Sequence, residues 1–137
     1  MSEAKPPVDV SLSWSEALVF HATSGRTSLV IDGDSTAGPS PIQLLAISLA
    51  GCMAMDVVDI VRKGRQPLTA FECRLTGERA PEHPRRFLKI HLHFHLAGAV
   101  ADAVVQRAIA LSHDKYCSVW HSMQQDIELS TTFDIEP

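Results

Sequence analysis

The sequence predicts an α+β fold, and we expect its 137 residues to form a single domain with a flexible N-terminal segment, residues 1–7. Three observations predict this fold: strand-like runs toward both ends of the chain, one long apolar helical stretch between them, and helical spacing before the last strand. Such segregation of strands and helices is typical of α+β architecture and differs from the regular alternation of a doubly wound sheet.

The first strands and the helix that follows them carry clear start and stop signals. Pro41 at the first helical position, Ser40 as N-cap and Gln43 completing a capping box predict where the long helix begins, and Gly64 predicts its end. Before this helix, three runs rich in β-branched and aromatic residues predict a β-meander, at 8–14, 17–23 and 27–32. A Gly/Ser/Pro-rich loop, 33–40, joins the meander to the helix.

The second half of the chain predicts three more strands and two shorter helices. Strands are expected at 71–78, 87–96 and 127–135, and helices at 102–112 and around 115–125. The helix of 41–63 is apolar around most of its circumference as far as Met55, so we expect its N-terminal half to be the core of the domain.

Charge and composition exclude several classes of function. The net charge of −4 arises from interspersed acids and bases, so the sequence has no basic stripe of the kind that binds nucleic acid or an anionic membrane. The N-terminus lacks the apolar core of a signal peptide, and the apolar stretch from Pro41 to Met55 is short for a membrane span. We expect a cytoplasmic protein, whose three cysteines would not form structural disulfides.

Cys52 and Cys117 are the candidates for chemistry. Cys52 lies about three turns into the long helix, beside Gly51, which would leave space for close approach of another backbone. If Asp114 caps the second C-terminal helix, Cys117 lies where a helix N-terminus favours a thiolate. Two such thiols suit peroxide reduction, in which a sulfenic acid on one condenses with the other.

Burial is the alternative explanation for these cysteines. Free cysteine is among the most buried residue types, and Cys52 lies in an apolar helix, so on spacing alone it could be a core residue. Cys73 alternates with Phe71 and Leu75 along a predicted strand, which indicates a packing role.

Two separated motifs resemble a known family. The stretch GPSPIQLLAISLAGCMAMDVVDIVRKGR resembles the central helix of OsmC/Ohr proteins, and DKYCSV resembles the second cysteine motif of the same family. FECRLTGER and FLKIHLHFHLAG are similar to the hairpin between them, so the resemblance extends from about Trp14 onward and points to the OsmC-like branch.

The resemblance implies an intertwined homodimer in which antiparallel sheets wrap around long buried central helices. It also implies that Cys52 attacks an organic hydroperoxide, and in some members hydrogen peroxide, and that Cys117 resolves the sulfenic acid to a disulfide. An external dithiol, of the lipoyl type or another, would then reduce that disulfide; no cofactor or metal is implied.

The chain departs from the family pattern around the attacking cysteine. Family peroxidases pair the thiolate with an Arg held by a Glu near the start of the central helix, but here the matching position is Ile42 and its neighbour is the neutral Gln43. Gln43 could accept a hydrogen bond from an Arg or serve only the capping box. Arg26, in TSGR, is the best candidate for the cation, although it could also be a solvated turn residue.

These departures leave two other functions open. One is a divergent relative that binds an apolar small molecule in the interfacial pocket without efficient peroxidase activity. The other is metal binding by His91, His93 and His95, which share one face of a strand but have no obvious further ligand. His113 and His121 flank Cys117 and could donate protons, or could be ordinary surface residues.

Overall fold

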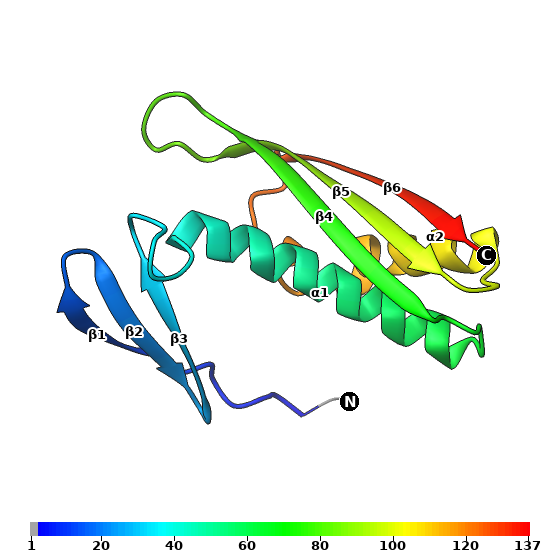
Figure 1. The fold of residues 1–137 in the computed structure, drawn as a ribbon, viewed down its shortest axis with the longest axis horizontal. Coiled ribbons are helices and arrows are strands. Elements are labelled where there is room, and N and C mark those ends of the chain that lie inside the picture. Colours follow the sequence, from blue (N-terminus) through cyan, green and yellow to red (C-terminus); the bar gives the residue numbers. More distant parts are fainter. Residues whose placement is uncertain (1–2) are drawn as a thin grey trace. The chain divides into compact units, whose positions relative to one another are not determined.

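The computed structural model describes residues 3–137, so the first two residues of the segment 1–7 lie outside the described residues. The chain forms two compact units, Met1–Leu45 and Ala46–Pro137. Its elements, drawn in Figure 1, are β1 (Ser11–Glu16), β2 (Val19–Ser24), β3 (Thr27–Asp32), α1 (Pro41–Lys63), β4 (Ala70–Arg79), β5 (Phe87–Ala97), α2 (Asp102–Leu111), the π-helical turn η1 (Ser112–Tyr116), the 3-10 turn η2 (Trp120–Ser122) and β6 (Glu128–Glu136).

The first unit contains the predicted β-meander. Strands β1, β2 and β3 form an antiparallel sheet in sequence order. The loop after β3 folds around the carboxylate of Asp32, which accepts hydrogen bonds from the backbone N–H groups of Asp34 (2.9 Å), Thr36 (3.2 Å) and Ala37 (2.9 Å). These backbone donors, Ala37 and Asp34 foremost, lower the pKa of Asp32, so the charged carboxylate organises the approach to α1.

The start of α1 follows its sequence signals. The backbone N–H of Ser40 donates to Oε1 of Gln43 at 2.9 Å, and the backbone N–H of Gln43 donates to Oγ of Ser40 at 3.3 Å. This reciprocal pair is the expected capping box, and it satisfies two N–H groups that a helix start leaves unpaired.

The second unit contains a three-stranded sheet in the order β4-β5-β6. Strands β4 and β5 are antiparallel, as expected, but β5 and β6 run parallel. The sheet is therefore mixed, which differs from the expected antiparallel arrangement. The reason is the long helical connection through α2, η1 and η2, because a crossover of this kind returns the chain in the same direction. The α+β class itself is confirmed.

The core of the second unit lies between the sheet and one stripe of α1. The fully buried side chains of β5 alternate along the strand, as a half-buried strand requires. Those of α1 recur every fourth residue and so lie on one face of the helix. The two sets are Ile90, Leu92, Phe94 and Leu96 from β5 and Leu49, Met53, Val57 and Val61 from α1.

The rest of α1 is not buried by the chain, contrary to our expectation that its apolar N-terminal half would form the core. Ile47 and Met55 are 56% and 74% exposed, and a Cβ built on Gly51, between them on the same face, would meet no atom within 4 Å. The close backbone approach expected at Gly51 is therefore absent from the described chain. The first unit also buries few of its own side chains: among residues 3–45 only those of Ala22 and Asp32 are buried.

The whole of α1, Pro41–Lys63, is longer than the apolar stretch Pro41 to Met55, which is short for a membrane span. Its 23 residues make it the one helix of the described chain that is long and apolar enough to cross a membrane by length and composition alone. Core helices of soluble proteins satisfy the same criterion.

The expected helix around 115–125 is absent from the described chain. The segment instead forms the π turn η1, a stretch through Cys117, and the short 3-10 turn η2. Asp114 does not cap a helix; its carboxylate lies 2.7 Å from Nδ1 of His113.

Candidate active site

The second unit brings Cys52 and Cys117 together, although 65 residues separate them in sequence. Cys52 is on α1, immediately before the buried Met53, and Cys117 follows η1. Cys52 lies close enough to Cys117 to raise the pKa of that thiol, and both thiols are free. Only tertiary folding could create this contact, so it is the feature of the structure that most favours thiol chemistry.

Cys117 is held in place by its own backbone and by the turn that follows it. Its N–H donates to the carbonyl of Ser112 at 2.8 Å, and its sulfur accepts a hydrogen bond from the backbone N–H of Trp120 at 3.3 Å. The side chain is fully buried. Its backbone is extended, with φ −73° and ψ 98°, so it follows a helical turn instead of lying within the first turn of a helix.

The expectation that a helix N-terminus favours the Cys117 thiolate is therefore wrong. Burial raises the pKa of Cys117 to about 11, the backbone hydrogen bond from Trp120 opposes this shift, and the adjacent Cys52 adds to it. Burial likewise raises the pKa of Cys73 to about 11. Cys73 lies on the same face of β4 as Phe71 and Leu75, all half-buried, which agrees with its expected packing role.

Alkylation should distinguish the three thiols. Because a raised pKa delays thiolate formation to higher pH, Cys73 and Cys117 should remain largely unmodified at pH 8 while the half-buried Cys52 reacts first. Their modification rates should rise about tenfold per pH unit until they level off near pH 11. Peptide mapping after iodoacetamide treatment measures this, with protein in denaturant as the control. Equal labelling of Cys52 and Cys117 at pH 8 would contradict the raised pKa of Cys117.

Three polar residues near the cysteines were not singled out from the sequence. Oγ of Ser118 lies 3.9 Å from Sγ of Cys52. Ser112, which is fully buried, donates from Oγ to Oδ2 of Asp56 at 2.8 Å. Ser118 lies within the DKYCSV motif and could have been noticed there, whereas no local signal pairs Asp56 with Ser112, 56 residues away.

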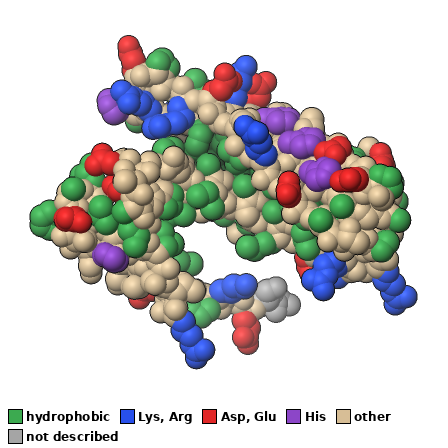
Figure 2. Space-filling model, in the orientation of Figure 1, with side chains coloured by type: hydrophobic (Ala, Val, Ile, Leu, Met, Phe, Trp, Pro, Cys, Tyr) green, Lys and Arg blue, Asp and Glu red, His purple; other side chains and the backbone are tan. Residues whose placement is uncertain are grey.

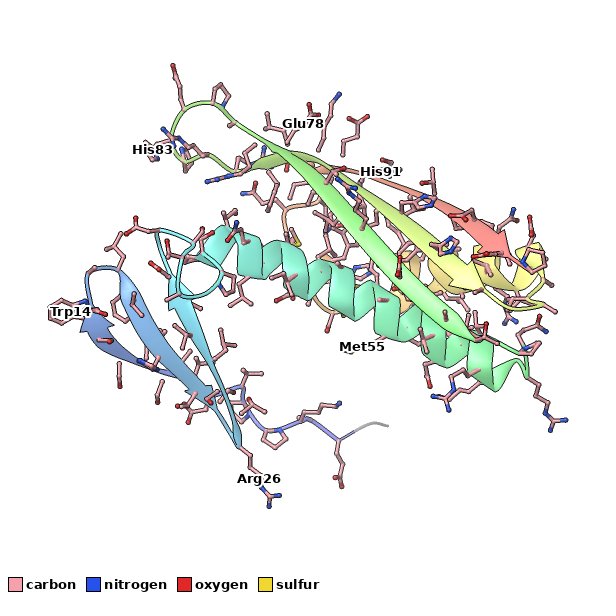
Figure 3. All side chains as sticks on the ribbon, in the orientation of Figure 1. Trp14, Arg26, Met55, Glu78, His83 and His91 are labelled. Carbon is pink, nitrogen blue, oxygen red and sulfur yellow. The ribbon has the colours of Figure 1, made fainter. Side chains whose placement is uncertain are left out.

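Arg26 and Gln43 both lie in the first unit, at different ends of it. Arg26 is exposed in the β2–β3 turn, where Gly25 adopts φ +59°, and its side chain projects from the tip of that turn (Figure 3). Gln43 uses its side-chain oxygen for the capping box at the start of α1. The capping role of Gln43 is therefore confirmed. No carboxylate replaces the missing Glu at either position 42 or 43.

The three strand histidines form a hydrogen-bonded ladder on the outer face of the sheet. As expected they share one face, and Figure 2 shows histidine and acidic side chains gathered over this sheet. Asp134 bridges His93 and His95 at 2.6 Å each, so carboxylates do lie beside these imidazoles, which the sequence did not indicate. Hydrogen bonding to Asp134 raises the pKa of His95, and both histidines lower the pKa of Asp134.

This ladder does not have the arrangement of a metal site. Within residues 3–137, no group of three or more His, Cys, Asp or Glu side chains is placed to hold a metal ion. His91 pairs instead with the hydroxyls of Ser130 and Thr132, at 2.7 and 2.9 Å, and Thr132 also pairs with His93 at 2.7 Å.

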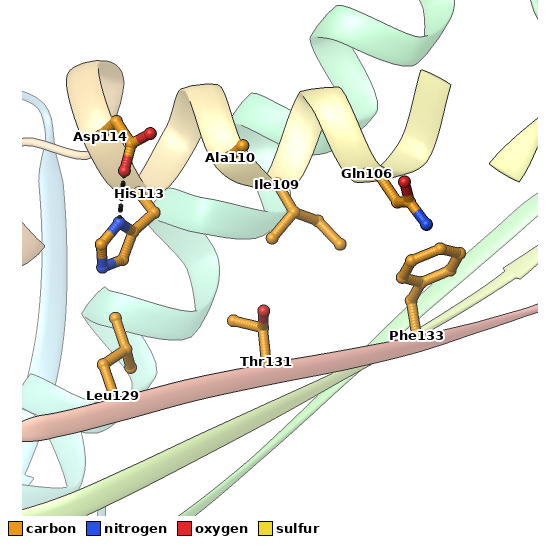
Figure 4. A pocket seen from close by; sticks show the side chains of 8 residues that line it. All are labelled: Gln106, Ile109, Ala110, His113, Asp114, Leu129, Thr131 and Phe133. Carbon is orange, nitrogen blue, oxygen red and sulfur yellow. Dashed lines mark hydrogen bonds and ion pairs between the residues drawn. The ribbon is translucent and has the colours of Figure 1, made fainter. Parts of the chain in front are cut away.

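Of the two histidines that flank Cys117, His113 lies beside a separate cavity. His113 lines a cavity of about 380 Å³ between α2 and β6, with Ile109, Leu129 and Phe133 among its walls (Figure 4). Its ring stacks on Trp120, with 5.8 Å between ring centroids, and its carbonyl lies 2.9 Å from Nε2 of His121. These contacts give both histidines structural partners and place neither of them on a cysteine sulfur.

Comparisons with known proteins agree with the fold. Residues 32–132 match the family described as OsmC-like protein. Protein YhfA of Escherichia coli (strain K12) is 37% identical over 127 residues, which cover 90% of this chain and 95% of that relative.

Solved structures show the same fold. A crystal structure of a hypothetical protein from Aquifex aeolicus VF5 has a TM-score of 0.89 and 25% identity, covering 96% of this chain and 98% of that one. A crystal structure of an organic hydroperoxide resistance protein OsmC from Legionella pneumophila has a TM-score of 0.71 and 14% identity, covering 96% and 99% of the two chains. The match across well over half of the sequence settles the family: this chain is a member of the OsmC-like proteins.

Proposed function

We propose that the protein is a cysteine-based peroxidase that reduces organic hydroperoxides, with hydrogen peroxide as a second substrate. The contact between Cys52 and Cys117 within the second unit is the observation that carries this proposal. The Legionella pneumophila protein of the same fold is named an organic hydroperoxide resistance protein, which is consistent with the same substrate class.

The proposed chemistry begins at Cys52, which is half-buried, while Cys117 is fully buried. The Cys52 thiolate attacks the outer oxygen of the hydroperoxide, the O–O bond breaks, and the alkoxide takes a proton and leaves as an alcohol. Cys117 then condenses with the Cys52 sulfenic acid: a disulfide forms and the oxygen leaves as water. The high pKa of Cys117 keeps this thiol protonated, and so protected, until the sulfenic acid is present.

Regeneration requires an external dithiol. A thiolate of the reductant attacks the Cys52–Cys117 disulfide, a mixed disulfide forms, and the second thiol of the reductant releases the protein in its reduced form. A lipoyl-type dithiol fits this step because both of its thiols lie on one small molecule.

Activation of Cys52 requires groups that stabilise negative charge. We assign this role to Arg26 by resemblance to the family, because a guanidinium favours a thiolate and stabilises the departing oxygen. Ser118 adds a hydroxyl 3.9 Å from the Cys52 sulfur, from which it could approach either the thiolate or the bound peroxide.

We further propose that the protein acts as a cytoplasmic homodimer. The exposed apolar face of α1 and the nearly coreless first unit leave more apolar surface open than a soluble monomer usually does. A second copy of the chain would cover this surface, as the resemblance to the family implies. Nucleic acid and membrane are not proposed as partners.

A second candidate function is favoured by one observation. The family Glu is absent, and Gln43, which could have replaced it, is held by Ser40 in the capping box. A protein lacking part of the activating apparatus could bind an apolar small molecule at the subunit interface without efficient turnover.

One experiment separates the two candidates. Reduced protein is treated with one equivalent of an alkyl hydroperoxide, quenched by alkylation in denaturant so that the buried thiols also react, and mapped by mass spectrometry. The peroxidase predicts a Cys52–Cys117 disulfide with Cys73 alkylated, whereas three alkylated cysteines would support the binding protein.

A further inference from the structure

A buried hydrogen bond joins the two segments that carry the cysteines. Ser112 is fully buried and donates from Oγ to Oδ2 of the half-buried Asp56 at 2.8 Å. Asp56 lies four residues after Cys52 on α1, so the two side chains are on the same face, one turn apart. The bond therefore fixes the Ser112 segment to α1 directly beside the proposed attacking thiol.

The backbone carries this restraint on to Cys117. Ser112 opens the π turn η1, and the N–H of Cys117 returns to the carbonyl of Ser112 at 2.8 Å. π turns are rare, and they occur often at functional sites. From Cys52 the connection runs one turn along α1 to Asp56, across to Ser112, through the π turn to Cys117, and back to the Cys52 sulfur.

This arrangement matters for one step of the proposed chemistry. Attack on the peroxide needs Cys52 and the bound substrate, and Cys117 takes no part in it. Disulfide formation needs the Cys117 sulfur to reach bonding distance of the Cys52 sulfenic acid, and small misplacements cost much of the rate of such steps. A carboxylate accepts the hydrogen bond of Ser112 more strongly than a neutral group would, so it suits a restraint of this kind.

We propose that Asp56 is a positioning residue which, through Ser112, holds Cys117 within reach of the Cys52 sulfenic acid and so sets the rate of disulfide formation. The inference rests on the proposed peroxidase function. Asp56 contacts neither substrate nor sulfur in this role. It affects only the position of Cys117.

The test measures the two steps separately. Asp56→Ala and Ser112→Ala remove the hydrogen bond from either side, and Asp56→Asn keeps an acceptor oxygen. Single-turnover reactions with an alkyl hydroperoxide are quenched at intervals, with dimedone trapping the sulfenic acid and peptide mapping following the disulfide. We expect the two alanine variants to form sulfenic acid within about twofold of the wild-type rate and to form the disulfide at least about tenfold more slowly.

The longer-lived sulfenic acid should also be oxidised further. In excess peroxide the alanine variants should accumulate Cys52 sulfinic acid earlier than the wild type, a change that a merely destabilised protein would not show. Asp56→Asn should restore most of the rate of disulfide formation. Asp59→Ala is the matched control, because Asp59 lies on the same helix with its carboxylate exposed and paired to Lys63 at 2.8 Å.

Several outcomes would overturn the inference. These are wild-type rates of disulfide formation in folded Asp56→Ala, equal slowing of both steps, or an Asp56→Asn variant as slow as Asp56→Ala. If Asp56→Ala does not fold, as judged by circular dichroism, Ser112→Ala and Asp56→Asn carry the test. A wild-type protein that forms no disulfide would count against the peroxidase function itself, which is a separate result.

Discussion

Replacing Cys52 with serine is expected to reduce the consumption of an alkyl hydroperoxide by the protein and a dithiol by about three orders of magnitude or more. A serine hydroxyl stays protonated at neutral pH and does not attack an O–O bond, so the first covalent step is lost. The rate of peroxide loss under excess dithiol, corrected for the uncatalysed reaction, measures the effect.

Cys73→Ser is the matched control for this substitution. Cys73 lies half-buried on β4, packs on the face of Phe71 and Leu75, and has no place in the proposed chemistry. Its replacement should leave the rate within about twofold of wild type, since a small change in packing costs little. Undiminished turnover by Cys52→Ser would remove the proposed function.

The second large effect concerns assembly. Met55→Asp should convert the proposed dimer into a monomer at micromolar concentration, because Met55 (Figure 3) is 74% exposed in the single chain. Met55 also lies on the same apolar face of α1 as Gly51 and Ile47. Burying a charge in place of a methionine costs about 3 kcal/mol or more in each protomer. Two such sites in a symmetric interface would raise the dimer Kd roughly 10⁴-fold.

Light scattering coupled to size exclusion measures this effect, and Met55→Leu is its control. Leucine keeps the apolar contact and should leave the dimer intact. Circular dichroism should show that the Met55→Asp chain keeps its helix and strands. A wild-type protein that is monomeric at all concentrations, or a Met55→Asp variant that remains dimeric, would show that this face of α1 is not the interface.

Local chemistry explains which parts of the fold could be predicted. The capping box of Ser40 and Gln43, the turn-rich loop before α1 and the alternation of β5 are all decided by residues near one another in sequence. The elements from β1 to α2 and the last strand are therefore confirmed in type and order, although β1 (Ser11–Glu16) begins three residues later than expected.

The segment around Cys117 could not be predicted in the same way. Its helical spacing indicated a second helix, but tertiary contacts determine its structure: Ser112 is buried against Asp56, and the chain adopts a π turn there. The raised pKa of Cys117 has the same origin, since burial outweighs the local backbone donors. The parallel β5–β6 pair also depends on how the crossover packs, which the strand patterns do not encode.

The predicted burial of the N-terminal half of α1 failed for a different reason. An all-round apolar helix predicts burial, and this prediction does not say what covers each face. The described chain covers only the stripe of Leu49, Met53, Val57 and Val61. A single sequence cannot distinguish a core built by one chain from one completed by a second copy.

Identification of the disulfide after one turnover tests the central claim most directly. Reduced protein treated with one equivalent of alkyl hydroperoxide should yield about one Cys52–Cys117 disulfide per chain, with Cys73 free, and Cys117→Ser should instead retain a sulfenic acid that dimedone traps at Cys52. Persistent free thiols at both Cys52 and Cys117, or a disulfide that involves Cys73, would contradict the account.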